Sequence, residues 1–140
     1  MAQGVEYMKS DLQLPRVFVH LGSLVNFSYP TNPQRSAIVN STNNTCLGGS
    51  GVDAAITIAG GDNLRVDREA LPVLRAHQDP RKVGRCKTGD AVITGPNQYG
   101  HLKTTYVIHA VGPNYNSPKY RNGEKNGDIK LLSYNMKMSN

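Results

Sequence analysis

Two side chains in the first half of the chain, Asn43 and Asp53, could form hydrogen bonds to a sugar hydroxyl or a water molecule. They flank a glycine-rich stretch between a strand-like and a helix-like segment. A side-chain amide can donate to and accept from a hydroxyl-rich ligand such as a ribose. A carboxylate near a helix start is kept ionised by the helix dipole, so Asp53 would be a weak general base but a good acceptor. The competing interpretation of Asp53 is a helix N-cap.

The glycines in this stretch, Gly48, Gly49 and Gly51, predict a close approach of a charged group to the backbone. Glycine loses the most backbone freedom on folding, so such a loop is costly without a purpose. Peptide N–H groups in a glycine-rich turn before a helix form an anion-binding concavity that suits a diphosphate. A Walker A loop is excluded because GK followed by Ser or Thr is missing. Residues 49–54 match G-x-G-x-x-A, but they do not follow their strand directly, which disfavours a dinucleotide fingerprint.

Strand-like and helix-like segments alternate along the chain, which predicts an α/β fold. Short apolar runs rich in β-branched residues favour strands that are covered on both faces. Strands are predicted over residues 16–22, 36–42, 90–95 and 104–113. Helices are predicted over residues 52–61, with Gly60 and Gly61 as a stop, over 67–78 and over 128–140.

Length and composition indicate one domain. A chain of 140 residues is long enough to bury a sizeable core. No apolar run approaches the ~18 residues of a membrane span, and the first residues lack the apolar region of a secretory signal. Cys46 and Cys86 have neither metal-ligand spacing nor a disulfide framework, so we expect no metal, no cofactor and an intracellular location, cytoplasmic or nuclear.

The net charge of +6, from 16 Lys and Arg against 10 Asp and Glu, favours an anionic partner. Much of the excess lies in RKVGRCK, residues 81–87, and in the polar tail. The segment has no interleaved aromatic residues of the kind that stack on bases. Nucleic acid is therefore a minority interpretation beside a phosphorylated small molecule, and a solvated basic surface is the simplest explanation of the charge.

Three segments resemble, in the same order, the signature of the macro domain family and especially of its MacroD-type branch. AIVNSTNNTCLGGSGVDAAI, residues 37–56, resembles AIVNAAN-x-x-LGGGGVD-x-A-I. GRCKTGDAVITG, residues 84–95, resembles C-x-T-G-E-A-x-I-T, and YVIHAVGPNY, residues 106–115, resembles YVIHTVGP. RVFVHLGSLV, residues 16–25, is similar to the opening strand and its G-D-I. The resemblance runs from about Arg16 to the last residue.

This resemblance implies a three-layer α/β/α fold with a mixed central sheet that binds ADP-ribose at the carboxyl ends of its strands. It implies hydrolysis of ADP-ribose esters, namely removal of mono-ADP-ribose from acidic side chains and deacetylation of O-acetyl-ADP-ribose. Water would attack at the distal ribose, assisted by a substrate phosphate and aligned by Asp53, with Asn43 at the same ribose. A non-catalytic ADP-ribose reader is the alternative. The implied partners are ADP-ribose or ADP-ribosylated proteins, and we expect a monomer. The implied ligand-binding residues are Ser23, Leu24, Ser41, Thr42, Asn43, Gly48, Gly49, Ser50, Gly51, Val52 and Asp53.

The sequence departs from the family pattern in two ways. Ser23 stands where the family usually has an aspartate that recognises the adenine amino group, so adenine selectivity should weaken, because a neutral hydrogen bond is weaker than a charge-assisted one. Residues 1–14 are expected to be an N-terminal extension, and residues 15–140 a macro domain without the family's last strands and helix. The predicted strand over residues 16–22 would then lack its neighbours, or would pair elsewhere.

Three further polar or sulfur-bearing residues are predicted to be structural. His109 lies within a strand, where a lone histidine is most often packed and hydrogen-bonded. Asn40 is predicted to be a buried strand-end residue that satisfies loop backbone groups. Cys86 is interpreted as a small buried apolar residue, because no histidine partner that would activate it is identifiable.

Overall fold

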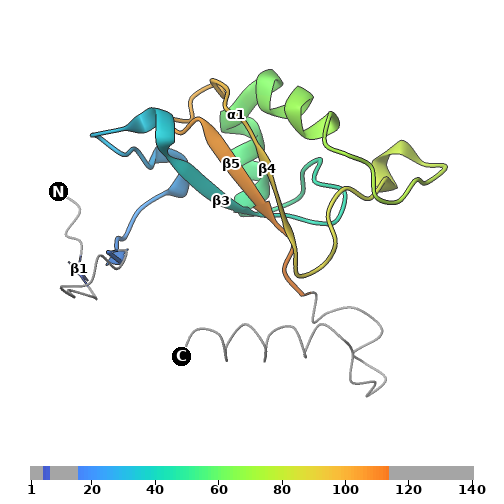
Figure 1. The fold of residues 1–140 in the computed structure, drawn as a ribbon, viewed down its shortest axis with the longest axis horizontal. Coiled ribbons are helices and arrows are strands. Elements are labelled where there is room, and N and C mark those ends of the chain that lie inside the picture. Colours follow the sequence, from blue (N-terminus) through green and yellow to red (C-terminus); the bar gives the residue numbers. More distant parts are fainter. Residues whose placement is uncertain (1–4, 7–15, 114–140) are drawn as a thin grey trace, which may run out of the picture.

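The computed structural model describes residues 5–6 and 16–113 (Figure 1). Its order of strands and α-helix is β1 (Val5–Glu6), β2 (Phe18–Val19), β3 (Ala37–Ser41), α1 (Val52–Glu69), β4 (Ala91–Thr94) and β5 (Tyr106–Ala110). Short 3-10 turns cover Leu24–Asn26, Pro33–Arg35 and Pro80–Lys82. The predicted helix over residues 128–140 lies outside the described residues.

Strands β3, β4 and β5 form a mixed sheet in the order β3-β5-β4. β3 runs parallel to β5, with Asn40 opposite His109, and β4 runs antiparallel to β5, with Val92 opposite the same histidine. The inward residues of β3 alternate with exposed ones, which is the period-two pattern of a strand. Three of the four predicted strands and the α/β fold class with a mixed sheet are thereby confirmed.

The predicted strand over residues 16–22 is shorter than expected and lies outside this sheet. Only Phe18 and Val19 are extended as a strand, and they pair antiparallel with Val5 and Glu6 of β1. Both Phe18 and Val19 are about half exposed. The preference of apolar residues for strands comes largely from the packing and burial of their side chains. Because these side chains are half exposed, the strand covers only the two residues that pair with β1.

The helix after the glycine loop is longer than predicted, and the separate helix over residues 67–78 is wrong. Gly61 has non-helical dihedral angles, with φ of 62° and ψ of −157°. The helix is therefore interrupted at Gly61, where the sequence predicted that it would end. The helix then resumes and ends at Glu69. Pro72 explains the end, because its ring would clash with the carbonyl of Arg68 and because it disfavours helical geometry at Leu71.

The core lies between α1 and one face of the sheet (Figure 1). Apolar side chains from both layers, and from the segment that joins β4 to β5, are buried together: Ile38, Ile56, Ala59, Leu64, Tyr99, Leu102 and Val107. The joining segment is tied to the helix break by the peptide N–H of His101, which donates to the carbonyl of Ala59 at 2.7 Å. This packing fixes the start of α1 against the end of β3, where the glycine loop lies.

Replacing Gly100 by alanine should destabilise this contact strongly. Gly100 has φ of +46°, and an added Cβ would lie 2.3 Å from the carbonyl oxygen of Ala59. We expect Gly100→Ala to lower the free energy of unfolding by about 2 kcal/mol or more, because helix and loop must move apart. Urea unfolding measures the change. Gly22→Ala is the matched control, since a Cβ there meets nothing within 4 Å; similar midpoints for both variants would contradict the prediction.

Candidate functional site

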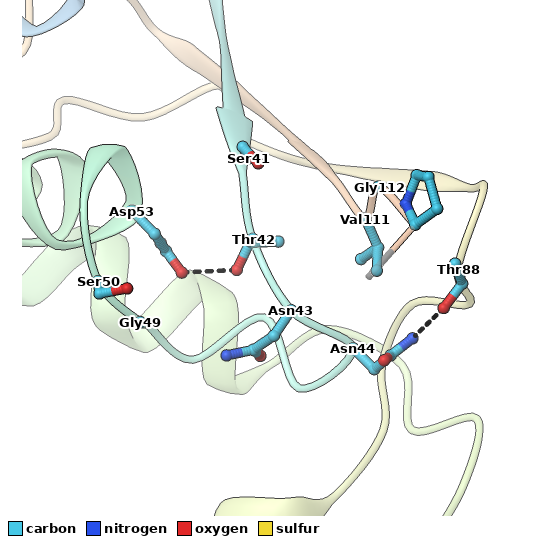
Figure 2. Close-up of a pocket in the computed structure, with 11 residues that line it drawn as sticks. Ser41, Thr42, Asn43, Asn44, Gly49, Ser50, Asp53, Thr88, Val111 and Gly112 are labelled. Atoms are coloured by element: carbon cyan, nitrogen blue, oxygen red, sulfur yellow. Dashed lines mark hydrogen bonds between the residues drawn. The ribbon is translucent and has the colours of Figure 1, made fainter. Parts of the chain in front are cut away.

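A pocket of about 540 Å³ opens at the carboxyl ends of the parallel strands β3 and β5 (Figure 2). It is lined by four segments of the chain. The residues after β3 contribute Ser41, Thr42, Asn43 and Asn44; the glycine loop and α1 contribute Gly49, Ser50 and Asp53; the segment before β4 contributes Thr88; and the residues after β5 contribute Val111, Gly112 and Pro113. Ligands of α/β sheets bind at this edge because loops from neighbouring strands diverge there.

Residues 48–51, which we call the glycine loop, leave their peptide N–H groups available. Gly48 and Gly51 have φ of +128° and +61°, a region that residues with a Cβ rarely adopt. Within the part of the chain that the structure describes, no hydrogen bond uses the N–H of Gly48, Gly49, Ser50 or Gly51 as donor. Free N–H groups beside a helix N-terminus can receive an anion.

Asp53 lies at the floor of the pocket and is almost fully buried. Its Oδ1 accepts from Asn40 Nδ2 at 2.9 Å and pairs with an Arg68 guanidinium nitrogen at 2.9 Å. Its Oδ2 accepts from Thr42 Oγ1 at 2.7 Å. Burial by itself would raise the pKa of Asp53, but the hydrogen bonds from Asn40 and Thr42 and the charge of Arg68 outweigh it and leave the pKa below its ordinary value.

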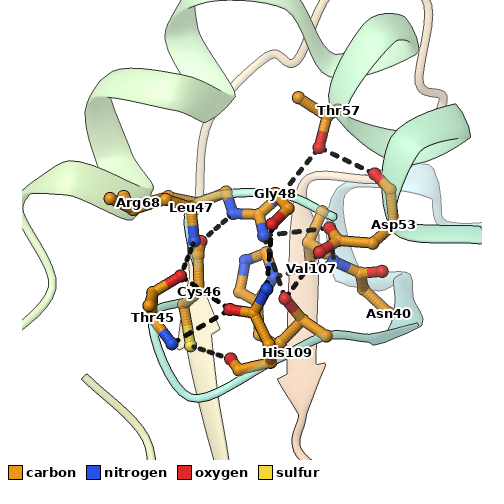
Figure 3. A network of polar contacts seen from close by, with 12 residues as sticks. Asn40, Thr45, Cys46, Leu47, Gly48, Asp53, Thr57, Arg68, Val107 and His109 are labelled. Atoms are coloured by element: carbon orange, nitrogen blue, oxygen red, sulfur yellow. Dashed lines mark hydrogen bonds and ion pairs between the residues drawn. The ribbon is translucent and has the colours of Figure 1, made fainter. Parts of the chain in front are cut away.

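The N-cap of α1 is Gly51, so Asp53 is the second helical residue. The alternative interpretation of Asp53 as the N-cap residue is therefore wrong. Its carboxylate instead points into a network that includes Asn40 (Figure 3). Asn40 is buried as predicted, but its partners are the side chains of Asp53 and His109 and not loop backbone.

Asn43 braces the glycine loop through its own side chain. Its Oδ1 accepts from the backbone N–H of Thr45 at 3.0 Å and from Thr45 Oγ1 at 2.6 Å, while its Nδ2 donates to the carbonyl of Gly48 at 3.0 Å. This is the local side-chain-to-backbone bonding that asparagine favours in turns. Both functional groups of the Asn43 amide thus have partners within the loop.

The neighbouring Asn44 connects the loop to the segment before β4. Its Nδ2 donates to the carbonyl of Cys86 at 2.9 Å and to Thr88 Oγ1 at 3.3 Å, and its own carbonyl accepts from the N–H groups of Arg85 and Cys86. This brings Thr88 to the pocket wall (Figure 2). Asn44, Thr88 and the residues after β5 were not among the predicted site residues. The parallel pairing of β3 with β5 was the signal that could have found residues 111–113.

Six of the predicted ligand-binding residues line the pocket: Ser41, Thr42, Asn43, Gly49, Ser50 and Asp53. Gly48, Gly51 and Val52 lie next to them in the same loop and helix start without lining it. Ser23 and Leu24 lie at the start of the turn Leu24–Asn26, and neither belongs to the lining of this pocket. Among residues 5–6 and 16–113, no three His, Cys, Asp or Glu side chains are grouped so that they could hold a metal ion.

His109 is a buried core residue, as predicted. Its Nδ1 accepts from Asn40 Nδ2 at 3.2 Å, so its Nε2 carries the proton and donates to Thr94 Oγ1 at 3.0 Å. Burial, with the nearby charge of Arg68, lowers the pKa of His109 to about 4, and the charge of Asp53 opposes this shift. Cys86 is also buried, as predicted, and packs with Cys46 and Val111.

The buried His109 should make the protein less stable at mildly acidic pH. Its folded pKa of about 4 lies below its ordinary value of 6.5, so the unfolded chain binds the extra proton between these values. Stability is full above about pH 6.5 and is lost as the pH falls towards 4. We expect a loss of about 2 kcal/mol between pH 7 and pH 5, measured by urea unfolding. His109→Gln should largely remove this slope; an unchanged slope would count against His109 as its source.

A pocket at the carboxyl edge of an α/β sheet, bounded by a glycine loop and a helix start, places the chain among the α/β domains with a site at the ends of their parallel strands. The particular family is shown by comparison: the Macro domain model matches residues 39–136, and the chain belongs to the macro domain family. Among the structural neighbours, the Oceanobacillus iheyensis macrodomain with ADP has a TM-score of 0.61 at 23% identity, covering 95% of this chain and 58% of that one, which supports the fold alone.

Two curated relatives have higher sequence identity. A macro domain-containing protein of Caldanaerobacter subterraneus is 46% identical over 97 residues, covering 69% of this chain and 46% of that protein. An O-acetyl-ADP-ribose deacetylase of Pantoea vagans is 42% identical over 103 residues, covering 74% of this chain and 51% of that protein. The chain therefore spans about half the length of the curated relatives that it matches. In the part of the chain that the structure describes, no helix has the length and apolar character to cross a membrane.

Proposed function

We propose that the pocket binds ADP-ribose, with the diphosphate against the free N–H groups of the glycine loop. The observation that carries this proposal is that, within the described residues, the N–H groups of Gly48, Gly49, Ser50 and Gly51 have no hydrogen-bond acceptor, beside the start of α1. The pocket volume of about 540 Å³ lies within the ordinary range for small-ligand sites. The distal ribose would then lie near Asp53 and the residues that follow β3.

We further propose that the bound ADP-ribose ester is hydrolysed. A water molecule would cleave the ester at the distal ribose, releasing the acid and leaving a free ribose hydroxyl. The low pKa of Asp53 makes its carboxylate a poor proton acceptor but a fixed hydrogen-bond acceptor, so its role would be to align the ribose or the water. A phosphate of the substrate would assist the attack. The relatives named O-acetyl-ADP-ribose deacetylases support this class of reaction.

The second candidate is a reader that binds ADP-ribose without turnover. It is favoured by a specific observation, which is that both Asp53 oxygens and both groups of the Asn43 amide already have partners within the protein. Either side chain would have to share or exchange a hydrogen bond before it could act on a substrate. If neither side chain exchanges a hydrogen bond, the glycine loop can still bind the ligand.

Calorimetric titration and a turnover assay distinguish these functions. ADP-ribose should bind at least about tenfold more tightly than AMP, because AMP lacks the second phosphate for the glycine loop. Release of acetate from O-acetyl-ADP-ribose, or of ADP-ribose from a modified acidic side chain, would support the hydrolase. Binding without either release would support the reader. No heat of binding from a well-folded sample would overturn both.

A further inference from the structure

Arg68 is a buried cation that contacts Asp53, one of the residues that line the pocket (Figure 3). Its side chain is 1% exposed, and it is not one of the lining residues. One terminal nitrogen lies 2.9 Å from Asp53 Oδ1 and donates to Thr42 Oγ1 at 3.2 Å, and the other donates to Thr57 Oγ1 at 2.9 Å. Its Nε donates to the carbonyl of Cys46. The guanidinium therefore touches both sides of the glycine loop and the floor of the pocket.

The break in α1 is what allows this contact. Arg68 follows Asp53 by fifteen residues in the same helix, and a straight α-helix would place their Cα atoms about 22 Å apart. An arginine side chain cannot span that distance to reach a carboxylate. The non-helical Gly61 lies between the two residues and redirects the second part of the helix. The fold thus brings a cation from the end of α1 back to its start.

The ion pair between Arg68 and Asp53 affects how well the pocket can accept an anionic ligand. Among the lining residues in the described chain, Asp53 is the only one with an ionisable side chain. A diphosphate in the pocket would meet a carboxylate and no lysine or arginine in direct contact. Interactions between charges are strong where water is excluded, so an uncompensated Asp53 would oppose an anionic ligand. The positive charge of Arg68 lies against that carboxylate and makes the pair nearly neutral.

We propose that Arg68 is a positioning residue that sets the anion affinity of the pocket by neutralising Asp53, without touching the ligand. The inference rests on the proposed binding of ADP-ribose and extends it. It assigns Arg68 an electrostatic role that is separable from its role in holding the loop. A purely structural Arg68 would change the stability of the fold and the position of the loop, but it would give no preference for the sign of the ligand's charge.

A four-variant comparison tests this proposal by the sign of each effect. Titration with ADP-ribose is carried out on the wild type, Asp53→Asn, Arg68→Met and the double variant. Arg68→Met leaves the carboxylate alone and should weaken binding at least about tenfold. Asp53→Asn leaves the cation alone and should tighten it about threefold or more. The double variant restores neutrality and should bind within about threefold of the wild type.

The outcomes that overturn the proposal are equally specific. If Asp53→Asn and the double variant bind ADP-ribose equally, the charge of Arg68 does not matter. If Asp53→Asn binds both ADP-ribose and inorganic pyrophosphate, which has no ribose to contact Asp53, more weakly than the wild type, the charge of Asp53 does not oppose the ligand. The comparison of Asp53→Asn with the double variant does not need Arg68→Met to fold. The comparison of the wild type with the double variant needs neither single variant, and a double variant that binds more than about tenfold more weakly than the wild type would also overturn the proposal. The double variant replaces the whole ion pair, which is often tolerated.

A second measurement separates this proposal from the proposed function. Inorganic pyrophosphate is titrated against the same variants, because it presents the same charges without ribose or adenine. If the wild type binds pyrophosphate but not ADP-ribose, the proposed function fails while the order Asp53→Asn, wild type, Arg68→Met still tests the charge effect. The reverse order with pyrophosphate would overturn the role of Arg68 whatever ADP-ribose does.

Discussion

Asp53→Ala is expected to lower the free energy of unfolding by about 3–5 kcal/mol, because it leaves the buried guanidinium of Arg68 without its anion. Asp53 and Arg68 are 2% and 1% exposed. The substitution also removes the acceptor of the Thr42 hydroxyl and one of the two acceptors of Asn40 Nδ2, which keeps only His109 Nδ1. Urea unfolding at pH 7 measures the change.

A matched control is available on the same helix. Asp62 pairs with Arg65 at 3.4 Å, but both side chains are largely exposed. Asp62→Ala should change stability by less than about 1 kcal/mol, because water screens an exposed pair. The two substitutions delete the same chemical group from the same element. Comparable losses for Asp53→Ala and Asp62→Ala would contradict the assignment of the large effect to a buried charge.

Gly51→Ala is expected to weaken ADP-ribose binding at least about tenfold, equivalent to about 1.4 kcal/mol. Gly51 has φ of 61° and ψ of −127°, a combination that an L-residue with a Cβ avoids. No atom lies within 4 Å of the position of an added Cβ, so the substitution acts through the backbone and not through a clash. The loop would relax, and its N–H groups would no longer converge on one anion. Calorimetric titration of the folded variant measures the loss.

Ser50→Ala is the control for that substitution, because it keeps the peptide N–H of Ser50, which is the group that the proposal assigns to the ligand, and removes only the hydroxyl. Ser50 is exposed, adjoins Gly51, and makes no side-chain hydrogen bond within the described residues. Its removal should leave the loop backbone and the affinity for ADP-ribose within about twofold of the wild type. Equal affinities for Gly51→Ala and the wild type would show that the ligand does not depend on this loop conformation.

The elements that carry the site follow from local sequence patterns. The β-branched runs that became β3, β4 and β5 are confirmed as strands. The helix start after Gly51 was also predicted, because helix formers follow glycine and an acidic residue there. These features depend on residues close together in sequence. Residues 41–43, 49–50 and 53, which were predicted as ligand-binding residues, lie at the ends of these elements and line the pocket.

The features that sequence patterns missed depend on contacts between distant residues. The predicted strand over residues 16–22 had the right composition, but its extent depends on a pairing partner, which among the described residues is Val5–Glu6. The pair of Asp53 and Arg68 could not be predicted, because it requires the helix to break at Gly61 and then continue. Gly60 and Gly61 were correctly interpreted as an interruption, but propensity alone does not say whether a helix resumes.

The adjoining thiols of Cys46 and Cys86 make the pocket's own fluctuations measurable. Cys46 belongs to the segment that Asn43 and Arg68 hold in place, and burial raises its pKa to about 11. At neutral pH a thiol of this kind is protonated and shielded, so a disulfide reagent reacts only when the segment transiently opens. The rate of thiol labelling therefore reports how often this segment, which adjoins the pocket, opens, and a ligand that stabilises the segment should slow the reaction as its occupancy rises.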